Sequence, residues 1–206
     1  MIPLHDDNPT EIVPVVTVAF IVACVLVFLW QTGLGGLGNE AAVMALGVIP
    51  AVLLDRAELA PELALVPAAM TPLTSMFLHG GFMHLAGNML YLWIFGNNVE
   101  DAMGHVRFVL FYLLCGIAAV LAQALPNTDS TIPMIGASGA ISGVLGAYLL
   151  LYPHARVLVL IPIGFYTRLV HLPAMAVLGF WFVLQLINSA FADPRGGGVA
   201  FGRKFS

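Results

Sequence analysis

Hydrophobic residues along this chain gather in long runs, and short polar stretches separate one run from the next. A helix needs about 20 predominantly apolar residues to cross the hydrocarbon core of a bilayer. Five runs approach or reach that length, and we interpret each one as a membrane-spanning helix. The pattern therefore predicts a single transmembrane domain over residues 1–206. We expect its fold to be an all-α, polytopic membrane helix bundle. The five predicted spans lie at about residues 13–30, 82–99, 108–125, 135–152 and 169–191.

The segment between the first two runs, residues 31–78, has a different character. Glycines between Gly33 and Gly38 interrupt the helix pattern, and charged residues and prolines are scattered among the hydrophobic ones after them. This segment is too polar and too broken to span a bilayer. We expect a long loop with short amphipathic helices that lie in the membrane interface. A connection of this length is usually functional.

The composition supports a membrane protein and excludes other classes. Of the 206 residues, 60% are hydrophobic and only 9% are charged, whereas soluble domains carry about 25% charged residues. The net charge of −4 offers no basic surface for nucleic acid, so we expect no nucleic-acid partner. Cys24 and Cys115 fall in apolar runs, and we interpret them as small buried hydrophobic residues, not as a disulfide or a metal-binding pair.

The positions of Lys and Arg predict the orientation, because cytoplasmic loops of membrane proteins are enriched in these residues. With the N-terminus inside, Arg107, Arg156 and Arg168 are cytoplasmic, and Arg56 lies outside. The basic residues that follow the fifth run would then lie on the unfavoured side, and a sixth span would carry them back. We therefore expect a cytoplasmic N-terminus and a chain that has been cut short.

One polar side chain stands out in the fourth run. Ser138 lies between Gly136 and Gly139, and neighbouring glycines leave its hydroxyl sterically open. One interpretation is structural: Gly139 and Gly143 begin a stripe of small residues for helix packing, and Ser138 bonds a carbonyl of its own helix. The other interpretation is chemical, with Ser138 as a nucleophile that needs an adjacent general base.

A second polar pair lies in the run before it. His84 and Asn88 are four residues apart and share one face of the predicted helix. Polar groups within a span usually face the bundle interior. Both side chains can donate hydrogen bonds, so together they could stabilise an oxyanion. The alternative is a structural bond from the pair to a loop carbonyl.

Histidines are the candidate bases for Ser138. His79 and His84 lie at the same end of the predicted bundle as the start of the fourth run, whereas His171 starts the fifth run at the opposite end. The remaining histidines also lie at that opposite end. No aspartate falls inside a predicted span, so a three-residue Ser-His-Asp triad is not available.

Taken together, these residues resemble the rhomboid family of intramembrane serine proteases. The likeness rests on Gly136-Ala-Ser138-Gly139, on His84-Leu-Ala-Gly-Asn88, on the long loop before the second run and on Glu100-Asp-Ala-Met-Gly-His105 after it. The family implies a six-helix bundle in which Ser138 attacks a peptide bond in or near a substrate's transmembrane segment. His84, Asn88 and the backbone N–H of Ser138 would hold the oxyanion.

The resemblance also implies partners and location. Transmembrane protein substrates and the lipid bilayer are the expected partners, and no metal or organic cofactor is expected. We expect an integral membrane protein, in a bacterial inner membrane. The general base would be a histidine on the sixth helix.

At that last point the sequence departs from the family. The segment 196–201 resembles the start of the sixth helix, but Lys204 stands about where the histidine would be, and no base histidine is found. Two functions stay open: an intramembrane serine endopeptidase, or an inactive rhomboid-like protein that binds transmembrane clients without cleaving them. A small-solute transporter is disfavoured, because the sequence shows no pair of related halves.

Overall fold

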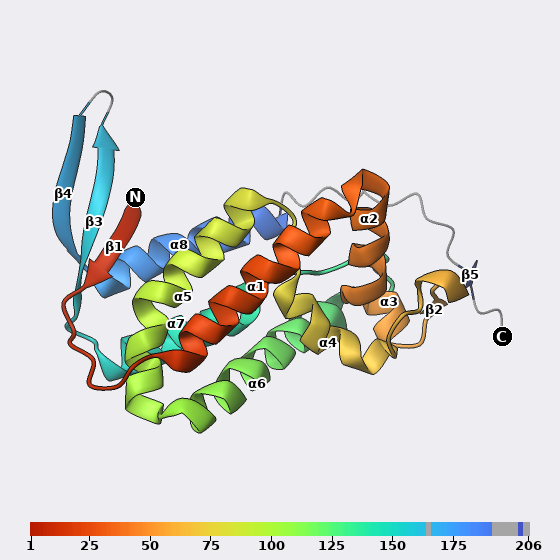
Figure 1. Ribbon diagram of the computed structural model, residues 1–206, viewed down its shortest axis with the longest axis horizontal. Coiled ribbons are helices and arrows are strands. Elements are labelled where there is room, and N and C mark those ends of the chain that lie inside the picture. Colours follow the sequence, from red (N-terminus) through yellow and green to blue (C-terminus); the bar gives the residue numbers. More distant parts are fainter. Residues whose placement is uncertain (164–165, 191–201, 204–206) are drawn as a thin grey trace.

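The computed structural model describes residues 1–163, 166–190 and 202–203, and its longer helices pack together as a bundle (Figure 1). The long helices are α1 (Val15–Gly33), α5 (Phe82–Met103), α6 (His105–Ala124), α7 (Ser138–Leu151) and α8 (Ala174–Ala190). Shorter helices follow α1, namely α2 (Gly35–Leu46), α3 (Pro50–Leu53) and α4 (Thr71–Thr74). Four single turns of 3-10 helix are η1 (Pro61–Leu63), η2 (Ala68–Met70), η3 (Ser75–Phe77) and η4 (Leu125–Asn127).

Two helical segments are long and apolar enough to cross a membrane by themselves. They are α1 and the segment 105–127, which consists of α6 with η4. The segment 61–77 and α5 pass the same test only as a pair, and the two are bent by 80° at the break between them. Helix α7 and the first part of α8 are apolar but shorter. The lengths therefore agree with a membrane helix bundle, and the number of five spans stays a prediction.

The core forms around α5, which packs against α1, α6 and α7. Its buried face includes Leu92 and Phe95, and the Phe95 ring meets the Tyr148 ring of α7 edge to face at 4.8 Å. Helices α6 and α7 approach closely, because a Cβ on Gly139 would lie only 2.6 Å from the Cβ of Ala119. The small-residue stripe of the fourth run is therefore the contact surface between these two helices.

A buried carboxylate ties the start of α1 to the end of α5. Glu100 is fully buried and accepts hydrogen bonds from the backbone N–H groups of Val16 and Thr17, at 2.9 and 2.7 Å, and from the Thr17 hydroxyl at 2.7 Å. The ring of His105 lies 2.6 Å from the same carboxylate. Since the first N–H groups of a helix have no partner within the helix, Glu100 supplies the N-terminal cap of α1.

A three-stranded antiparallel sheet corrects the all-α prediction. It consists of β1 (Ile2–Asp6), β3 (Arg156–Ile163) and β4 (Tyr166–Pro173) in the order β1-β3-β4. We predicted that the fifth span begins at residue 169, but residues 169–173 belong to β4 and the helix begins at Ala174. An apolar run of this kind does not distinguish helix from strand by composition alone. Here the valines and isoleucines favour the strand.

The segment between α1 and α5 is folded back onto the bundle. Val48 forms an antiparallel bridge with Met134, with N···O distances of 3.0 and 2.7 Å. The N–H of Ala51 donates to the carbonyl of Ser130 at 3.0 Å. A two-residue strand, β2 (Ala57–Glu58), pairs with β5 (Gly202–Arg203). This segment therefore fixes the chain that leads into α7.

Candidate active site

Ser138 is the first residue of α7, and the two residues before it turn the chain into the helix. Gly136 has φ of +121°, a conformation that L side chains rarely adopt. Its N–H donates to the carbonyl of Ser75 at 2.9 Å. The turn before Ser138 is thus held by the loop that precedes α5, and it requires a glycine.

The ring of His84 lies directly against this turn. A Cβ built on Gly136 would lie 2.7 Å from Cε1 and 2.8 Å from Nε2 of His84. His84 is half-buried and lies in the first turn of α5. The N–H of Gly80 donates to Nδ1 of His84 at 3.4 Å. Because Nδ1 accepts this hydrogen bond, the proton of the neutral ring is on Nε2. Nε2 lies beside Gly136 and can donate a hydrogen bond.

Asn88 lies one turn further along α5 and is 1% exposed. Neither its amide nitrogen nor its amide oxygen has a hydrogen-bond partner among the described residues. Its Nδ2 lies 3.8 Å from the Cβ position of Gly136. Leaving a buried polar group unpaired costs about 1–3 kcal/mol, and no group among the described residues offsets that cost for the Asn88 amide.

The Ser138 hydroxyl is half-buried, and among the described residues it has no hydrogen bond. The bond that we considered for Ser138, from a hydroxyl to a carbonyl of its own helix, is made instead by Ser142, which donates to the Ser138 carbonyl at 2.7 Å. The N–H groups at the start of α7 lack partners within the helix and favour negative charge. The Ser138 hydroxyl therefore lies at a helix N-terminus and is not engaged in a structural hydrogen bond among the described residues.

The structure places part of the predicted site together. The His84 ring lies against Gly136, the Asn88 amide lies near it, and Ser138 follows Gly136 by two residues. Gly139, the other glycine of the motif, faces α6 and not His84, because a Cβ at this position would clash with Ala119. Its contribution is the close approach of two helices.

Sequence reasoning placed His79 at the correct end of the bundle but gave it no partners. His79 is 1% exposed, and its ring meets the His84 ring edge to face, with centroids 5.2 Å apart. Its Nδ1 lies 3.2 Å from the carbonyl of Phe77, whereas its Nε2 is buried without a partner among the described residues. His79 thus packs against the ring that lies beside Gly136.

Gln31 was missed altogether. This buried side chain of α1 accepts a hydrogen bond from the N–H of His79 at 3.0 Å and donates to the His79 carbonyl at 3.3 Å. It also donates to the Asn39 side chain at 3.0 Å. The available signal was a glutamine at the end of an apolar run, because polar residues in such places usually face the bundle interior.

The segment 196–201, which resembles the start of a sixth helix, and Lys204 lie outside the described residues. Two other histidines lie at the far end of the bundle: His105 is bound to Glu100, and His171 lies 3.8 Å from Asp7. Among the described residues, no three His, Cys, Asp or Glu side chains are grouped so that they could hold a metal ion.

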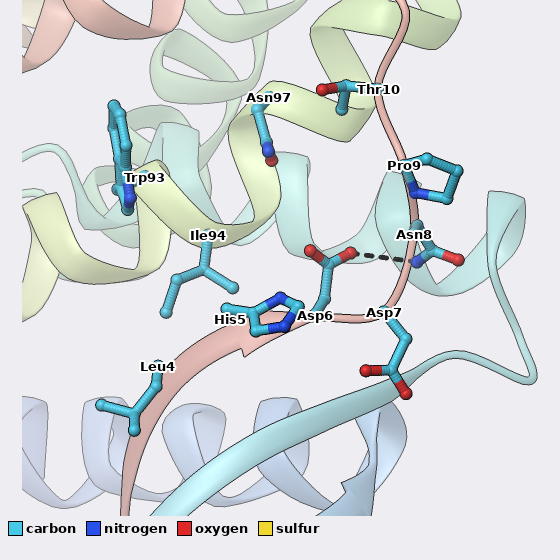
Figure 2. Close-up of a pocket in the computed structure, with 10 residues that line it drawn as sticks. All are labelled: Leu4, His5, Asp6, Asp7, Asn8, Pro9, Thr10, Trp93, Ile94 and Asn97. Atoms are coloured by element: carbon cyan, nitrogen blue, oxygen red, sulfur yellow. Dashed lines mark hydrogen bonds between the residues drawn. The ribbon is translucent and has the colours of Figure 1, made fainter.

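Two cavities lie away from Ser138. One, of about 380 Å³, is lined by the N-terminal segment from Leu4 to Thr10 and by Trp93, Ile94 and Asn97 of α5 (Figure 2). In it, the Asn8 amide donates to the Asp6 carboxylate at 3.0 Å. The other, of about 590 Å³, is lined by the segment between α1 and α5. Neither cavity is lined by Ser138, His84 or Asn88.

Comparison with known proteins gives a consistent result. The rhomboid domain family matches residues 68–201. The rhomboid protease GluP of Bacillus subtilis is 34% identical over 177 residues, which cover 86% of this chain and 32% of that protein. Rhomboid protein 1 of Saccharomyces cerevisiae mitochondria is 36% identical over 100 residues, 47% of this chain and 29% of that protein. The chain thus spans about a third of the length of these curated relatives.

Proposed function

The chain belongs to the rhomboid family, and we propose that it is an intramembrane serine endopeptidase with Ser138 as its nucleophile. The substrates are membrane proteins, and the cleaved peptide bond lies in or near a transmembrane segment. Rhomboid relatives such as the GluP protease support the reaction class. The apolar helices support an integral membrane protein.

The observation that carries the proposal is the unpaired amide of Asn88. It is 1% exposed, it has no partner among the described residues, and it lies beside the glycine that precedes Ser138. When the Ser138 oxygen attacks a peptide carbonyl, the carbonyl oxygen becomes negative. The Asn88 amide, the Nε2–H of His84 and the N–H at the start of α7 can then donate to that oxygen.

The reaction proceeds in two stages. In the first, a bond forms between the Ser138 oxygen and the carbonyl carbon, the hydroxyl proton passes to a general base, and the peptide nitrogen leaves with a proton as an amine. In the second, water attacks the ester carbonyl carbon, the bond from that carbon to the serine oxygen breaks, the serine oxygen takes back a proton, and the other fragment leaves as a carboxylic acid. The oxyanion donors that we propose for this scheme are all described residues. The position that the sequence assigned to the base, residue 204, lies outside them.

A fluorophosphonate probe tests the proposal, because it reacts with an activated serine. The purified full chain in detergent should be labelled, should cleave a transmembrane substrate, and should lose both properties in Ser138→Ala. Ser142→Ala is the matched control, because it removes a hydroxyl one turn further along α7. Labelling that persists in Ser138→Ala would refute Ser138 as the nucleophile.

A second candidate function is a rhomboid-like protein that binds transmembrane clients without cleaving them. The supporting observation is that, among the described residues, no side chain accepts a proton from the Ser138 hydroxyl through a hydrogen bond. The two candidates separate in the same experiment. Client binding without any labelling of Ser138 would favour the binding protein.

We also propose that the N-terminus is cytoplasmic and that the membrane is a bacterial inner membrane. Arg107 lies in the first turn of α6, Arg156 begins β3, and the N-terminal strand β1 pairs with β3. These basic residues and the N-terminus are thus at one end of the bundle, as the positive-inside rule favours. A reporter fused to the N-terminus that is active only in the periplasm should stay inactive.

A further inference from the structure

The β3–β4 hairpin projects from the end of the bundle where α1 begins (Figure 1). We name its two faces by their residues. The inner face carries Val157, Val159 and Ile161 of β3 with their cross-strand partners on β4, and the outer face carries Leu158 and Leu160 with theirs. In an antiparallel pair, directly opposed residues lie on the same face.

The inner face is directed at the helix bundle near the base of the hairpin. Val157 and Val159 are fully buried and belong to the main hydrophobic core. Asp6 of β1 is paired with Val157, and its carboxylate accepts a hydrogen bond from the Tyr148 hydroxyl of α7 at 2.6 Å. At this level the helices cover the sheet.

Further along the hairpin the inner face extends beyond the helices. Ile161 is only half-buried, and its partner Arg168 is exposed. Tyr166, at the start of β4, is 80% exposed. The far half of the inner face is therefore not covered by the helices.

The outer face also exposes hydrophobic side chains. Ile2, Leu160 and Leu169 are cross-strand neighbours in one row, and Leu169 is 61% exposed. A projecting hairpin with Leu169 exposed on its outer face and Tyr166 exposed on its inner face is poorly suited to water. It is suited to the membrane interface, where apolar residues are buried and tyrosine and arginine reach the headgroups.

The charge of the hairpin is of one sign. Residues 156–163 and 166–173 contain Arg156 and Arg168 but no Asp or Glu. Basic residues at the surface attract anionic lipid headgroups, and tyrosine is enriched at membrane interfaces. From exposure, register and charge together, we propose that the β3–β4 hairpin is a membrane-surface anchor. Its far half lies among the headgroups of the leaflet where α1 begins, with Arg168 on a lipid phosphate.

Nitroxide accessibility tests this anchor without reference to proteolysis. The full chain carries Cys24→Ala and Cys115→Ala, and one spin label is attached at Tyr166→Cys or Leu169→Cys, in nanodiscs of zwitterionic and anionic lipid. Both labels should be several-fold less accessible to a water-soluble nickel chelate than a matched label at His154→Cys, an exposed turn residue at the same end. Both should be more accessible to oxygen, which concentrates in lipid.

If the label at either hairpin position is as accessible to the nickel chelate as the label at residue 154, the anchor proposal is refuted. If the cysteine-free background does not fold, p-benzoylphenylalanine at positions 166 and 169 of the native sequence gives the same comparison. Cross-links to lipid at both positions are then expected, and their absence would also overturn the anchor. Because none of these measurements uses activity, failure of the anchor is distinct from failure of the proposed protease.

Discussion

The imidazole rings of His79 and His84 meet edge to face, with their centroids 5.2 Å apart. Through this contact the loop before α5 supports the ring that lies against Gly136. Gln31 of α1 fixes the backbone of His79 through two hydrogen bonds. Helix α1 is therefore connected to the candidate active site through Gln31 and His79, although it is more than 100 residues from Ser138 in the sequence.

This contact predicts that His79 positions His84. In His79→Asn, the side-chain amide can still donate to the Phe77 carbonyl, but the ring that supports His84 is lost. We expect the rate of fluorophosphonate labelling of the folded protein to fall while the unfolding temperature stays close to that of the unmodified chain. The measurement compares labelling rate and unfolding temperature with those of His154→Asn, an exposed control. Equal losses of rate and stability would mean that His79 is only structural.

Asn88→Ala should separate catalysis from folding. Removing one oxyanion donor typically lowers the rate by roughly a hundred- to a thousand-fold. Because both amide atoms are unpaired among the described residues, we expect the free energy of unfolding to change by only about 1 kcal/mol. Cleavage rate and denaturant unfolding are the two measurements.

Asn98 of the same helix is the control for Asn88. It is fully buried, and its Nδ2 donates to the Asn8 carbonyl at 3.2 Å, at the other end of α5. Asn98→Ala should lower the free energy of unfolding by about 1 kcal/mol and leave the labelling rate of the folded protein unchanged. If instead Asn88→Ala behaves like Asn98→Ala, the oxyanion role is refuted.

Gly136→Ala should disrupt the site directly. The added methyl group would lie 2.7 Å from the His84 ring, and φ of +121° is strained for alanine. We expect the His84 side chain to be displaced and labelling of Ser138 to be lost, together with about 1–3 kcal/mol of stability. Gly146→Ala on α7 has open space around the new methyl group and should stabilise the helix by about 0.5–1 kcal/mol.

Glu100→Gln should weaken the fold without altering the chemistry. The amide keeps the shape of the carboxylate but loses the charge that accepts three hydrogen bonds from the first turn of α1. Hydrogen bonds to charged groups contribute about 1.5–3 kcal/mol each, and we expect a loss within that range. Thermal unfolding in detergent measures it. Labelling of Ser138 per folded molecule should not change, and a selective loss of labelling would contradict this assignment.

Asp101→Asn is the matched control for Glu100→Gln. Asp101 accepts from the backbone N–H groups of Glu11 and Ile12, at 3.0 and 2.8 Å, near the surface. Because water can replace these bonds, the loss of stability should be smaller than that of Glu100→Gln. An equal loss would show that burial of Glu100 is not what makes its cap strong.

The site could be predicted in part from spacing. His84 and Asn88 share a helix face whatever surrounds them, because positions four apart always do. The glycines beside Ser138 indicated an open hydroxyl. The support from His79 and Gln31 could not be predicted, because Gln31 and His79 are 48 residues apart and are joined only by folding of the loop between them.

The sheet could not be predicted from the apolar pattern. Residues 156–173 read as a loop followed by the start of a span, since a hydrophobic run satisfies a helix or a strand equally well. The pairing of β3 with β1 joins residues more than 150 positions apart. That contact lies beyond any local pattern.

The sequence by itself determined that this is an apolar, helical membrane protein of the rhomboid family. Run length and scarcity of charge are enough for the first part, because a helix that crosses lipid must satisfy its own backbone and present apolar side chains. Only the tertiary structure decided which polar groups meet. Contact between the His84 ring and Gly136 depends on how two helices and a folded loop pack, and packing joins residues that the sequence keeps 52 positions apart.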